Sequence, residues 1–509
     1  MRNYSSLLRL SRSCIAAGVI LFALGAHAAP LAPTLTPEQQ AVHVLNRVAF
    51  GPKPGDIERV SKMGVQNYLD EQLRPETLAY PPQLSERLAG LAAPNRTAGE
   101  VVGEYVELQK QVRDEDEGAR QRRRAALMAI ARQTAEARLA RAIDSPRQLE
   151  EVMVDFWYNH FNVFSGKGID RALVASYERD AIRPNVLGNF GVLLKATAHH
   201  PAMLYYLDNH LSSADGYSAG GKKAGAKARA TGLNENYARE LMELHTLGVD
   251  GGYSQQDVTE LARMLTGWTY DQRALIRNNQ TFRFDAARHD SGAKHWLGRE
   301  VAGIAGAGGV AEGDMALEVL ANHPATAHHI SYELAQYFVH DAPNQALVER
   351  MARVYLASNG DIRSVLRVLF ASSQFLAPDA AGAKFKTPYQ YVVSAARAAA
   401  TPVVDVAPLL ATMAQLGMPL YGCQTPDGYK NTEQAWLNPG ALTRRISFAT
   451  ALAAGKLPLA AGPAPALDAA RLEATLGPAI SPRTRDAVAA SAEPLRAAML
   501  LGSPDFMQR

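Results

Sequence analysis

Cysteine is almost absent from this chain of 509 residues, which contains only Cys14 and Cys423. We expect Cys14 to leave with an N-terminal signal, so the mature protein cannot form an internal disulfide and cannot build a cysteine-rich zinc site. An excess of charge of one sign is also missing, because 53 basic and 50 acidic residues leave a net charge of +3. This balance gives no case for a nucleic-acid partner.

Long apolar runs are missing after the N-terminus, so we predict no transmembrane segment in the mature chain. The N-terminus has the layout of a Sec-type secretory signal. Three arginines precede an apolar run that ends at Leu24, and the small-residue cleavage signal Ala26-His27-Ala28 follows. We therefore predict a signal peptide over residues 1–28, cleavage near Ala28, and a periplasmic or secreted protein.

Several familiar catalytic motifs are lacking as well. The chain has no Gly-x-Ser-x-Gly elbow, no phosphate-binding Gly-x-x-x-x-Gly-Lys-Ser/Thr loop, no Gly-x-Gly-x-x-Gly after a strand, and no His-Glu-x-x-His. These absences argue against hydride transfer, nucleotide hydrolysis and zincin-type proteolysis. Strand-like alternation is scarce, whereas helical periodicity and helix-start signals such as Thr36-Pro37 and Ser254 recur. The sequence therefore predicts a mainly α fold, with a few short strands in the 271–315 region.

Composition divides the mature chain into two parts. We expect a large helical domain over residues 29–455, with a long charged helix or helix pair at 100–145 and a Gly/Lys-rich, mobile loop at 211–231. An Ala/Pro-rich linker and a C-terminal helix are expected over 456–509.

The densest polar segment runs from Gly232 to His245, where a helix is expected to start near Asn234. Asn236, Glu240 and Glu243 are spaced i, i+4, i+7, so their side chains share one helix face. Convergent carboxylates can act as general acid and base or bind a hard cation. The alternative is a surface ladder of ion pairs, in which Arg239 pairs with Glu235 and Glu243.

Two further segments place polar groups among large aromatic residues. Asp155, Asn159 and His160 belong to a helix so aromatic that much of its surface must be buried, and they indicate either a cleft or a structural network. Asp208 and Asn209 follow a second such helix, directly before the Gly/Lys-rich loop.

Taken in order, these segments resemble the exported bacterial family known as DUF1800, a domain of unknown function. The matching stretches are HVLNRVAFGPKPGDIERV, MVDFWYNHFNV, HHPAMLYYLDN, GLNENYARELMELHTLGVDGGYSQQDVTELARMLTGW, HDSGAKHWLG and LGMPLYGCQTPDGYKNTEQAWLNPGALTRR. The resemblance covers about residues 40–450. It implies that the Asn234–His245 polar set is a family signature lining a cleft. Family members often lie beside genes for a sulfatase-like exported protein, which hints at a shared surface polymer and a co-encoded partner.

Three functional hypotheses follow. The first is a hydrolase or lyase acting on a glycan-like polymer through a carboxylate-rich cleft. Its predicted catalytic residues are Glu240, Glu243, Asp155, Asp208 and His160. Its predicted substrate-binding residues are Asn234, Asn236, Arg239, Asn159, Trp157, Asn209, Trp268 and Trp436. The second is a helical-bundle enzyme that holds a divalent metal with His245, Glu240 and Glu243. The third is a non-catalytic exported binding or assembly protein, partnered with the sulfatase-like product.

Overall fold

The computed structural model describes residues 34–110, 116–217, 232–460, 462 and 464–509. The predicted signal peptide at 1–28 and residues 218–231 of the predicted loop lie outside the described residues. Residues 35–509 group together by their contacts, and the C-terminal segment 456–509 is part of that group. In the described part of the chain, no helix is long and apolar enough to cross a membrane.

The chain is mainly α-helical, as the scarcity of strand-like alternation predicts. Its strands are short and antiparallel, and they pair as β1 (Trp268–Thr269) with β2 (Arg283–Phe284) and β3 (Lys294–Trp296) with β4 (Arg299–Val301). The register places Trp268 opposite Phe284 in the first pair and His295 opposite Glu300 in the second. These short strands lie in and beside the region where strands were predicted.

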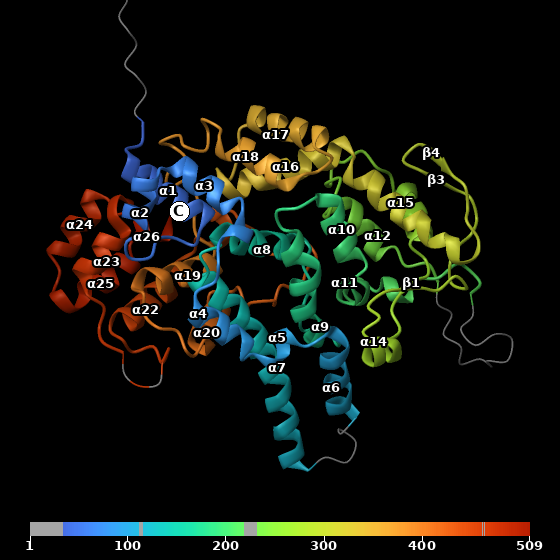
Figure 1. Cartoon of the computed structure of the whole chain (residues 1–509), viewed down its shortest axis with the longest axis horizontal. Coiled ribbons are helices and arrows are strands. Elements are labelled where there is room, and N and C mark those ends of the chain that lie inside the picture. The colour runs from blue at the N-terminus through green and yellow to red at the C-terminus, as the bar shows by residue number, and fades with distance from the viewer. Residues whose placement is uncertain (1–33, 111–115, 218–231, 461, 463) are drawn as a thin grey trace, which may run out of the picture. The chain divides into compact units, whose positions relative to one another are not determined.

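The helices are connected by turns and by longer loops such as 371–387 and 416–432 (Figure 1). The N-terminal third holds α1 (Pro37–Val48), α2 (Asp56–Met63), α3 (Val65–Gln72), α4 (Pro82–Ala89), α5 (Ala92–Asn95), α6 (Ala98–Lys110) and α7 (Glu117–Asp144). The middle holds α8 (Gln148–His160), α9 (Asp170–Ser176), α10 (Phe190–Ala198), α11 (Pro201–Tyr206), α12 (Asn236–Glu243), α13 (Gln255–Met264) and α14 (Gln272–Asn278). Next come α15 (Val310–Ala321), α16 (Pro324–Phe338), α17 (Gln345–Ala357), α18 (Ile362–Phe370), α19 (Pro388–Ala399) and α20 (Ala407–Gln415). The last are α21 (Glu433–Trp436), α22 (Pro439–Ala453), α23 (Ala469–Leu476), α24 (Pro482–Ala489), α25 (Glu493–Leu501) and α26 (Pro504–Met507).

Local capping explains where several helices begin. Thr36 and Ser254 each form a capping box. Their hydroxyl oxygen accepts a hydrogen bond from the backbone N–H three residues later, and the side chain of that later residue accepts one from the backbone N–H of the capping residue. Both caps satisfy backbone N–H groups that the first helical turn leaves free. The charged 100–145 segment contains a helix pair, α6 and α7.

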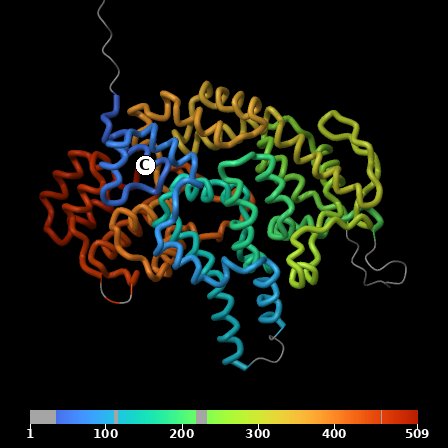
Figure 2. Tube along the Cα trace, in the orientation of Figure 1, coloured from blue at the N-terminus to red at the C-terminus, as the bar shows by residue number. Residues whose placement is uncertain are grey.

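The most buried helix near the site is α8, whose aromatic side chains face other helices on several sides. Phe156 packs edge-on against Tyr337 of α16, and Trp157 packs against Phe161 and Phe190. The chain then continues to the C-terminal helices, and the C-terminal end returns to lie beside α1 (Figure 2). The interior of the fold therefore brings together segments that are hundreds of residues apart.

Candidate functional site

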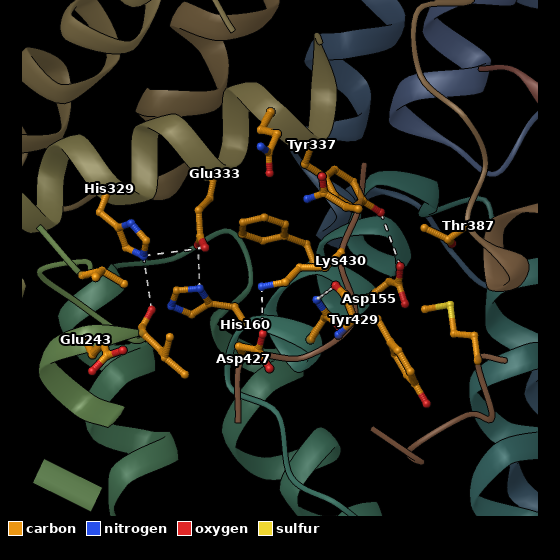
Figure 3. A pocket seen from close by; sticks show the side chains of 17 residues that line it. Asp155, His160, Glu243, His329, Glu333, Tyr337, Thr387, Asp427, Tyr429 and Lys430 are labelled. Carbon is orange, nitrogen blue, oxygen red and sulfur yellow. Dashed lines mark hydrogen bonds and ion pairs between the residues drawn. The ribbon is translucent and has the colours of Figure 1, made fainter. Parts of the chain in front are cut away.

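A pocket of about 260 Å³ is walled by α8, the end of α12, α16 and the segment 418–431 (Figure 3). Its lining is Asp155, Phe156, Asn159, His160, Glu243, Leu244, Val249, His329, Glu333, Gln336, Tyr337, Thr387, Met418, Asp427, Tyr429, Lys430 and Asn431. Four of the predicted site residues therefore meet in one place: Asp155, Asn159, His160 and Glu243.

Two asparagines of the α8 region hold the 418–431 segment against the helix. The Asn159 amide donates to the Tyr429 carbonyl at 2.8 Å and accepts from the Tyr429 backbone N–H at 2.7 Å. Asn162 donates to the carbonyls of Cys423 and Thr425 at 3.0 and 2.8 Å. Because a carboxamide offers both a donor and an acceptor, the Asn159 side chain pairs with the Tyr429 backbone as a peptide group of a neighbouring β-strand would. Its predicted substrate-binding role is thus replaced by a role in building the pocket wall.

Gly428 lets the 418–431 segment approach α8 this closely. Its φ is +65°, and a Cβ there would lie 2.3 Å from the Asn159 backbone oxygen. We expect Gly428→Ala to lower the free energy of unfolding by roughly 1–3 kcal/mol more than Gly417→Ala. Gly417 has a similar φ of +88° but open space around it, so it controls for backbone strain alone. Urea unfolding of both variants measures the difference, and equal losses would show that the contact is unimportant.

A carboxylate on α16 organises two histidines at the base of the pocket. His160 Nδ1 lies 2.7 Å from Glu333 Oε2, and His329 Nε2 lies 3.6 Å from Glu333 Oε1. Figure 3 shows both rings turned toward this carboxylate from different elements. Burial alone would raise the pKa of Glu333, but the charges of His160 and His329 and the hydrogen bond from His160 outweigh it and lower that pKa.

Both ring nitrogens of His160 face acceptors. Nδ1 meets the Glu333 carboxylate, and Nε2 lies 3.2 Å from the His245 carbonyl oxygen. A neutral imidazole carries one N–H, so both contacts are hydrogen bonds only when the ring is a cation. Both ring nitrogens of His160 are therefore engaged within the protein, and its predicted catalytic role stays a prediction.

The lowered pKa of Glu333 has a consequence for acid stability. A carboxylate whose pKa is depressed in the folded state stabilises the fold above its ordinary value near 4.5, and this stabilisation disappears as pH falls through the folded pKa. We therefore expect Glu333→Gln to lower the free energy of unfolding at neutral pH. We also expect this free energy to fall less steeply in the variant than in wild type below about pH 4.5.

Urea unfolding across a pH series measures this effect. The control is Glu349→Gln, which changes an exposed glutamate of α17. If the free energy of unfolding falls as steeply at low pH in Glu333→Gln as in wild type, the expectation is contradicted.

His245, the predicted metal ligand, is completely buried beyond the end of α12. Its ring lies 5.1 Å from that of Phe161, centroid to centroid, and burial, reinforced by the charge of His160, lowers its pKa to about 3. Glu240 and Glu243 are only partly buried. Across the residues that the structure describes, no three His, Cys, Asp or Glu side chains are grouped to hold a metal ion. The predicted His245–Glu240–Glu243 ligand set is therefore not assembled.

The carboxyl groups of Glu240 and Glu243 on α12 take no part in the surface ladder of ion pairs that the sequence offered as an alternative. Arg239 pairs with Glu235 at 3.2 Å, and within the described chain no hydrogen bond or ion pair reaches the side-chain carboxyl group of Glu240 or Glu243. Glu243 lines the pocket, and Glu240 lies one turn earlier. Burial and the charges of Glu243 and Asp427 raise the pKa of Glu240. Glu243 and Asp427 therefore line the pocket, and Glu240 lies close enough for both charges to act on it.

Asp427 carries the opposite shift. Burial would raise its pKa, but the hydrogen bonds from Lys430 and Thr425 outweigh burial and lower it. The Lys430 ammonium lies 2.7 Å from the Asp427 carboxylate. Neighbouring carboxyl groups whose environments push their pKa values apart are the usual basis of an acid and base pair.

Asp155 belongs to a buried charge network. It accepts from Arg138 at 2.7 Å and from the Tyr337 hydroxyl at 3.4 Å, and Arg138 also donates to Glu178 at 3.1 Å. Glu178 lies in a π-helical turn, Tyr177–Ile182, and binds Arg183 as well. This network favours the structural alternative for Asp155, and its predicted catalytic role stays a prediction.

The other predicted polar residues lie elsewhere. Asp208 pairs with Lys167 at 2.8 Å, and Asn209 is buried and donates to backbone carbonyls at 265 and 268. The Asn234 side chain accepts from the Asn236 backbone N–H at the start of α12. Asp208, Asn209, Asn234, Asn236 and Arg239 do not line the pocket.

The predicted aromatic platforms are also unavailable. Trp157 and Trp268 are 0% exposed, so no ring face is open to a ligand. The Trp157 indole donates to the Val186 carbonyl. Trp436 is 8% exposed, and its indole donates to the Lys430 carbonyl at 2.7 Å, which supports the pocket wall from behind. All three tryptophans are therefore part of the hydrophobic core.

Sequence reasoning missed the α16 face and the 418–431 wall. His329 and Glu333 are spaced i, i+4, a spacing that places both side chains on one helix face and that was available in the sequence. In the sequence, the run Asp427-Gly-Tyr-Lys430 indicated only a family resemblance. Its chemical role depends on contacts with α8 and α12, which are distant in sequence.

A family model described as a protein of unknown function (DUF1800) matches residues 43–508. No curated protein and no solved structure matches the chain.

Proposed function

The chain belongs to the DUF1800 family, and from this premise we propose that it is a hydrolase or lyase that acts on a glycan-like polymer at the pocket between α8, α12, α16 and the 418–431 segment. The observation that carries the proposal is a group of three carboxyl groups, of which Glu243 and Asp427 line the pocket and Glu240 lies beside them. Glu240 and Glu243 come from α12, and Asp427 comes from the facing segment.

The three carboxyl groups suit general acid–base chemistry. A general acid must hold its proton near working pH, and a base must be ionised there. The raised pKa of Glu240 favours the acid role, whereas the lowered pKa of Asp427 favours an ionised carboxylate. Glu243 lines the pocket between them as the second candidate base. Two carboxyl groups on facing elements are the arrangement that glycosidic bond cleavage requires.

The remaining lining supports a hydroxyl-rich substrate. Gln336, Thr387 and Asn431 supply neutral polar groups, and Tyr429 supplies an aromatic ring. A pocket of about 260 Å³ lies near the lower end of the size range of small-molecule sites, so it suits one sugar unit of a longer chain.

We place this activity outside the cytoplasm. The predicted signal peptide at 1–28 supports a periplasmic or secreted protein, where extracellular glycans are accessible. The resemblance adds a sulfatase-like exported protein as a candidate partner that acts on the same polymer.

The proposal is tested by incubating the purified protein with a panel of neutral, amino-sugar and uronate polymers. New reducing ends without ultraviolet absorbance indicate hydrolysis, and new double bonds indicate a lyase. Activity on one polymer class that is lost in Glu240→Gln supports the proposal. Turnover that is unchanged in Glu240→Gln, Glu243→Gln and Asp427→Asn alike would refute the assignment to this pocket.

A further inference from the structure

A second pocket, of about 600 Å³, lies between the middle of α7, α9, the start of α20 and the beginning of the 418–431 segment. Its volume falls within the usual range of small-molecule sites. It shares no lining residue with the carboxylate pocket, and no part of the proposed function uses it. Apart from Arg132, Thr134, Ser165, Arg171 and Tyr421, its lining residues are all apolar.

The wall that α7 contributes to this pocket is built largely from alanine. Ala125 and Ala129 lie one turn apart on the helix, and both are exposed. Because an alanine side chain ends at Cβ, this stretch of α7 leaves space that a larger residue would fill. Met128 lines the same space and is 61% exposed, and Leu410 and Leu420 are only partly buried. Contiguous apolar surface that remains in contact with water favours a ligand that covers it.

The hydroxyl groups in the lining differ in whether they already have partners. The Thr134 hydroxyl donates to the Ile130 carbonyl at 2.8 Å, and the Tyr421 hydroxyl donates to Glu178 at 2.7 Å. Ser165 is only partly buried, and within the described chain no hydrogen bond reaches its hydroxyl. The Ser165 hydroxyl is therefore available to a ligand.

Among the described residues, the charged groups that line the pocket are the guanidinium groups of Arg132 and Arg171. Arg171 is exposed, and in the described part of the chain it has no hydrogen-bond or ion-pair partner. Arg132 is 55% exposed, and its ion pair with Asp405 is long, at 3.5 Å. Both guanidinium groups are thus within reach of a ligand, and an exposed ion pair of this length competes weakly with one.

The carboxyl groups around the pocket do not compensate the charge of Arg171. Its neighbour Asp170 is completely buried, and burial raises the pKa of Asp170, which favours the neutral form. Glu178 is paired with two other arginines, and Asp405 is engaged by Arg132. Arg171 therefore adds to the rim a positive charge that no described carboxylate balances.

We propose that this pocket binds a long-chain carboxylate, a single acyl chain that ends in one negative charge. The acyl chain lies along the alanine wall of α7, against Met128, Leu410 and Leu420, and the carboxylate binds Arg171 with the Ser165 hydroxyl as a further donor. A planar carboxylate matches the guanidinium group, and one such group balances the one lining cation that has no partner. A partner helix fits less well: it is about 10–12 Å across, so this volume holds little more than one turn.

Binding of dodecanoate by the full chain tests the proposal. Calorimetric titration and thermal unfolding use sodium dodecanoate below its critical micelle concentration. Acetate supplies the head group alone, and dodecyltrimethylammonium supplies a chain of the same length with a cationic head. We expect a single saturable dodecanoate site with a rise in Tm of roughly 1–3 °C, no effect of acetate, and roughly tenfold or weaker binding of the cation. Equal binding of the cation, or no saturable binding of dodecanoate, would overturn the proposal.

Two substitutions locate the ligand. Ala129→Leu places a larger side chain at an exposed position of α7, where leucine is also a good helix former, so it fills the pocket without removing a contact. Arg171→Met removes the guanidinium group. We expect each to weaken dodecanoate binding by roughly tenfold or more. Ala357→Leu and Arg353→Met, at exposed positions of α17, are the matched controls and should bind like wild type. Wild-type affinity in either pocket variant would overturn the proposal.

Discussion

Replacing Glu240 by Gln lowers kcat on the polymer substrate by roughly 10²–10⁴-fold, the usual worth of a general acid or base. Glutamine keeps the size and hydrogen-bonding capacity of the side chain but cannot donate a proton to the leaving group. Glu240 is half-buried beside Glu243 and Asp427, and these surroundings raise its pKa, which favours the protonated form that a general acid needs. Steady-state kinetics on the polymer identified by the screen measures the effect.

The pH profile separates a proton-transfer role from a structural one. A general acid with a raised pKa stays protonated to higher pH than an ordinary glutamate, so wild-type activity should fall as pH rises through that pKa. This alkaline limb should be absent from the residual activity of Glu240→Gln. Glu349→Gln should show wild-type rate and profile. A slow variant that retained the limb would mean that Glu240 positions the substrate and another group supplies the proton.

Replacing Arg138 by Met lowers the free energy of unfolding by about 3–5 kcal/mol, the range seen when one partner of a buried ion pair is removed. Arg138 is 4% exposed and bridges the carboxylates of Asp155 and Glu178. The rings of Tyr158, Tyr389 and Tyr421 surround its guanidinium, each with its centroid 5.2–5.3 Å from the carbon. Methionine fills the space but leaves the buried carboxylate of Asp155 without its cation, and Glu178 keeps only its ion pair with Arg183.

The size of this loss should depend on pH. Burial raises the pKa of Asp155 against the opposing charge of Arg138, so without Arg138 this carboxyl group binds a proton more readily. Urea unfolding should show a smaller loss at pH 5 than at pH 7. Arg132→Met on the same helix is the control, because Arg132 is 55% exposed and its ion pair with Asp405 is long, at 3.5 Å. Equal losses in the two variants would contradict the importance of the network.

Much of the fold was predictable because it depends on local signals. The caps at Thr36 and Ser254 and the scarcity of strand-like alternation are properties of short windows of sequence, and all three predictions are confirmed. The helix pair in the 100–145 segment follows from charge and periodicity in the same way.

The site was predictable only where its residues share an element. Asp155, Asn159 and His160 were recognised together because they lie on one helix, and Glu240 and Glu243 because they lie on another. Which of them would be free could not be read from spacing. Asp155 meets Arg138 and His160 meets Glu333 through tertiary packing, and these partners lie on other elements that spacing within α8 does not reveal.

Aromatic residues were misjudged for a related reason. A tryptophan beside polar residues suits a sugar platform and a core position equally well, and only burial separates the two. Trp157 and Trp268 are enclosed on all sides, whereas the ring that lines the pocket belongs to Tyr429.

The hydrogen bonds between Asn159 and Tyr429 also determine when, during translation, the pocket can form. The two residues are 270 positions apart, and at roughly 5–20 residues per second a ribosome needs on the order of tens of seconds to add that length. During this interval α8 has been synthesised without the segment that covers Asn159, and for the first part of it also without α16, against which its aromatic rings pack. A nascent chain of this protein must therefore protect an aromatic helix from aggregation, and the pocket can form only after most of the polypeptide has been made.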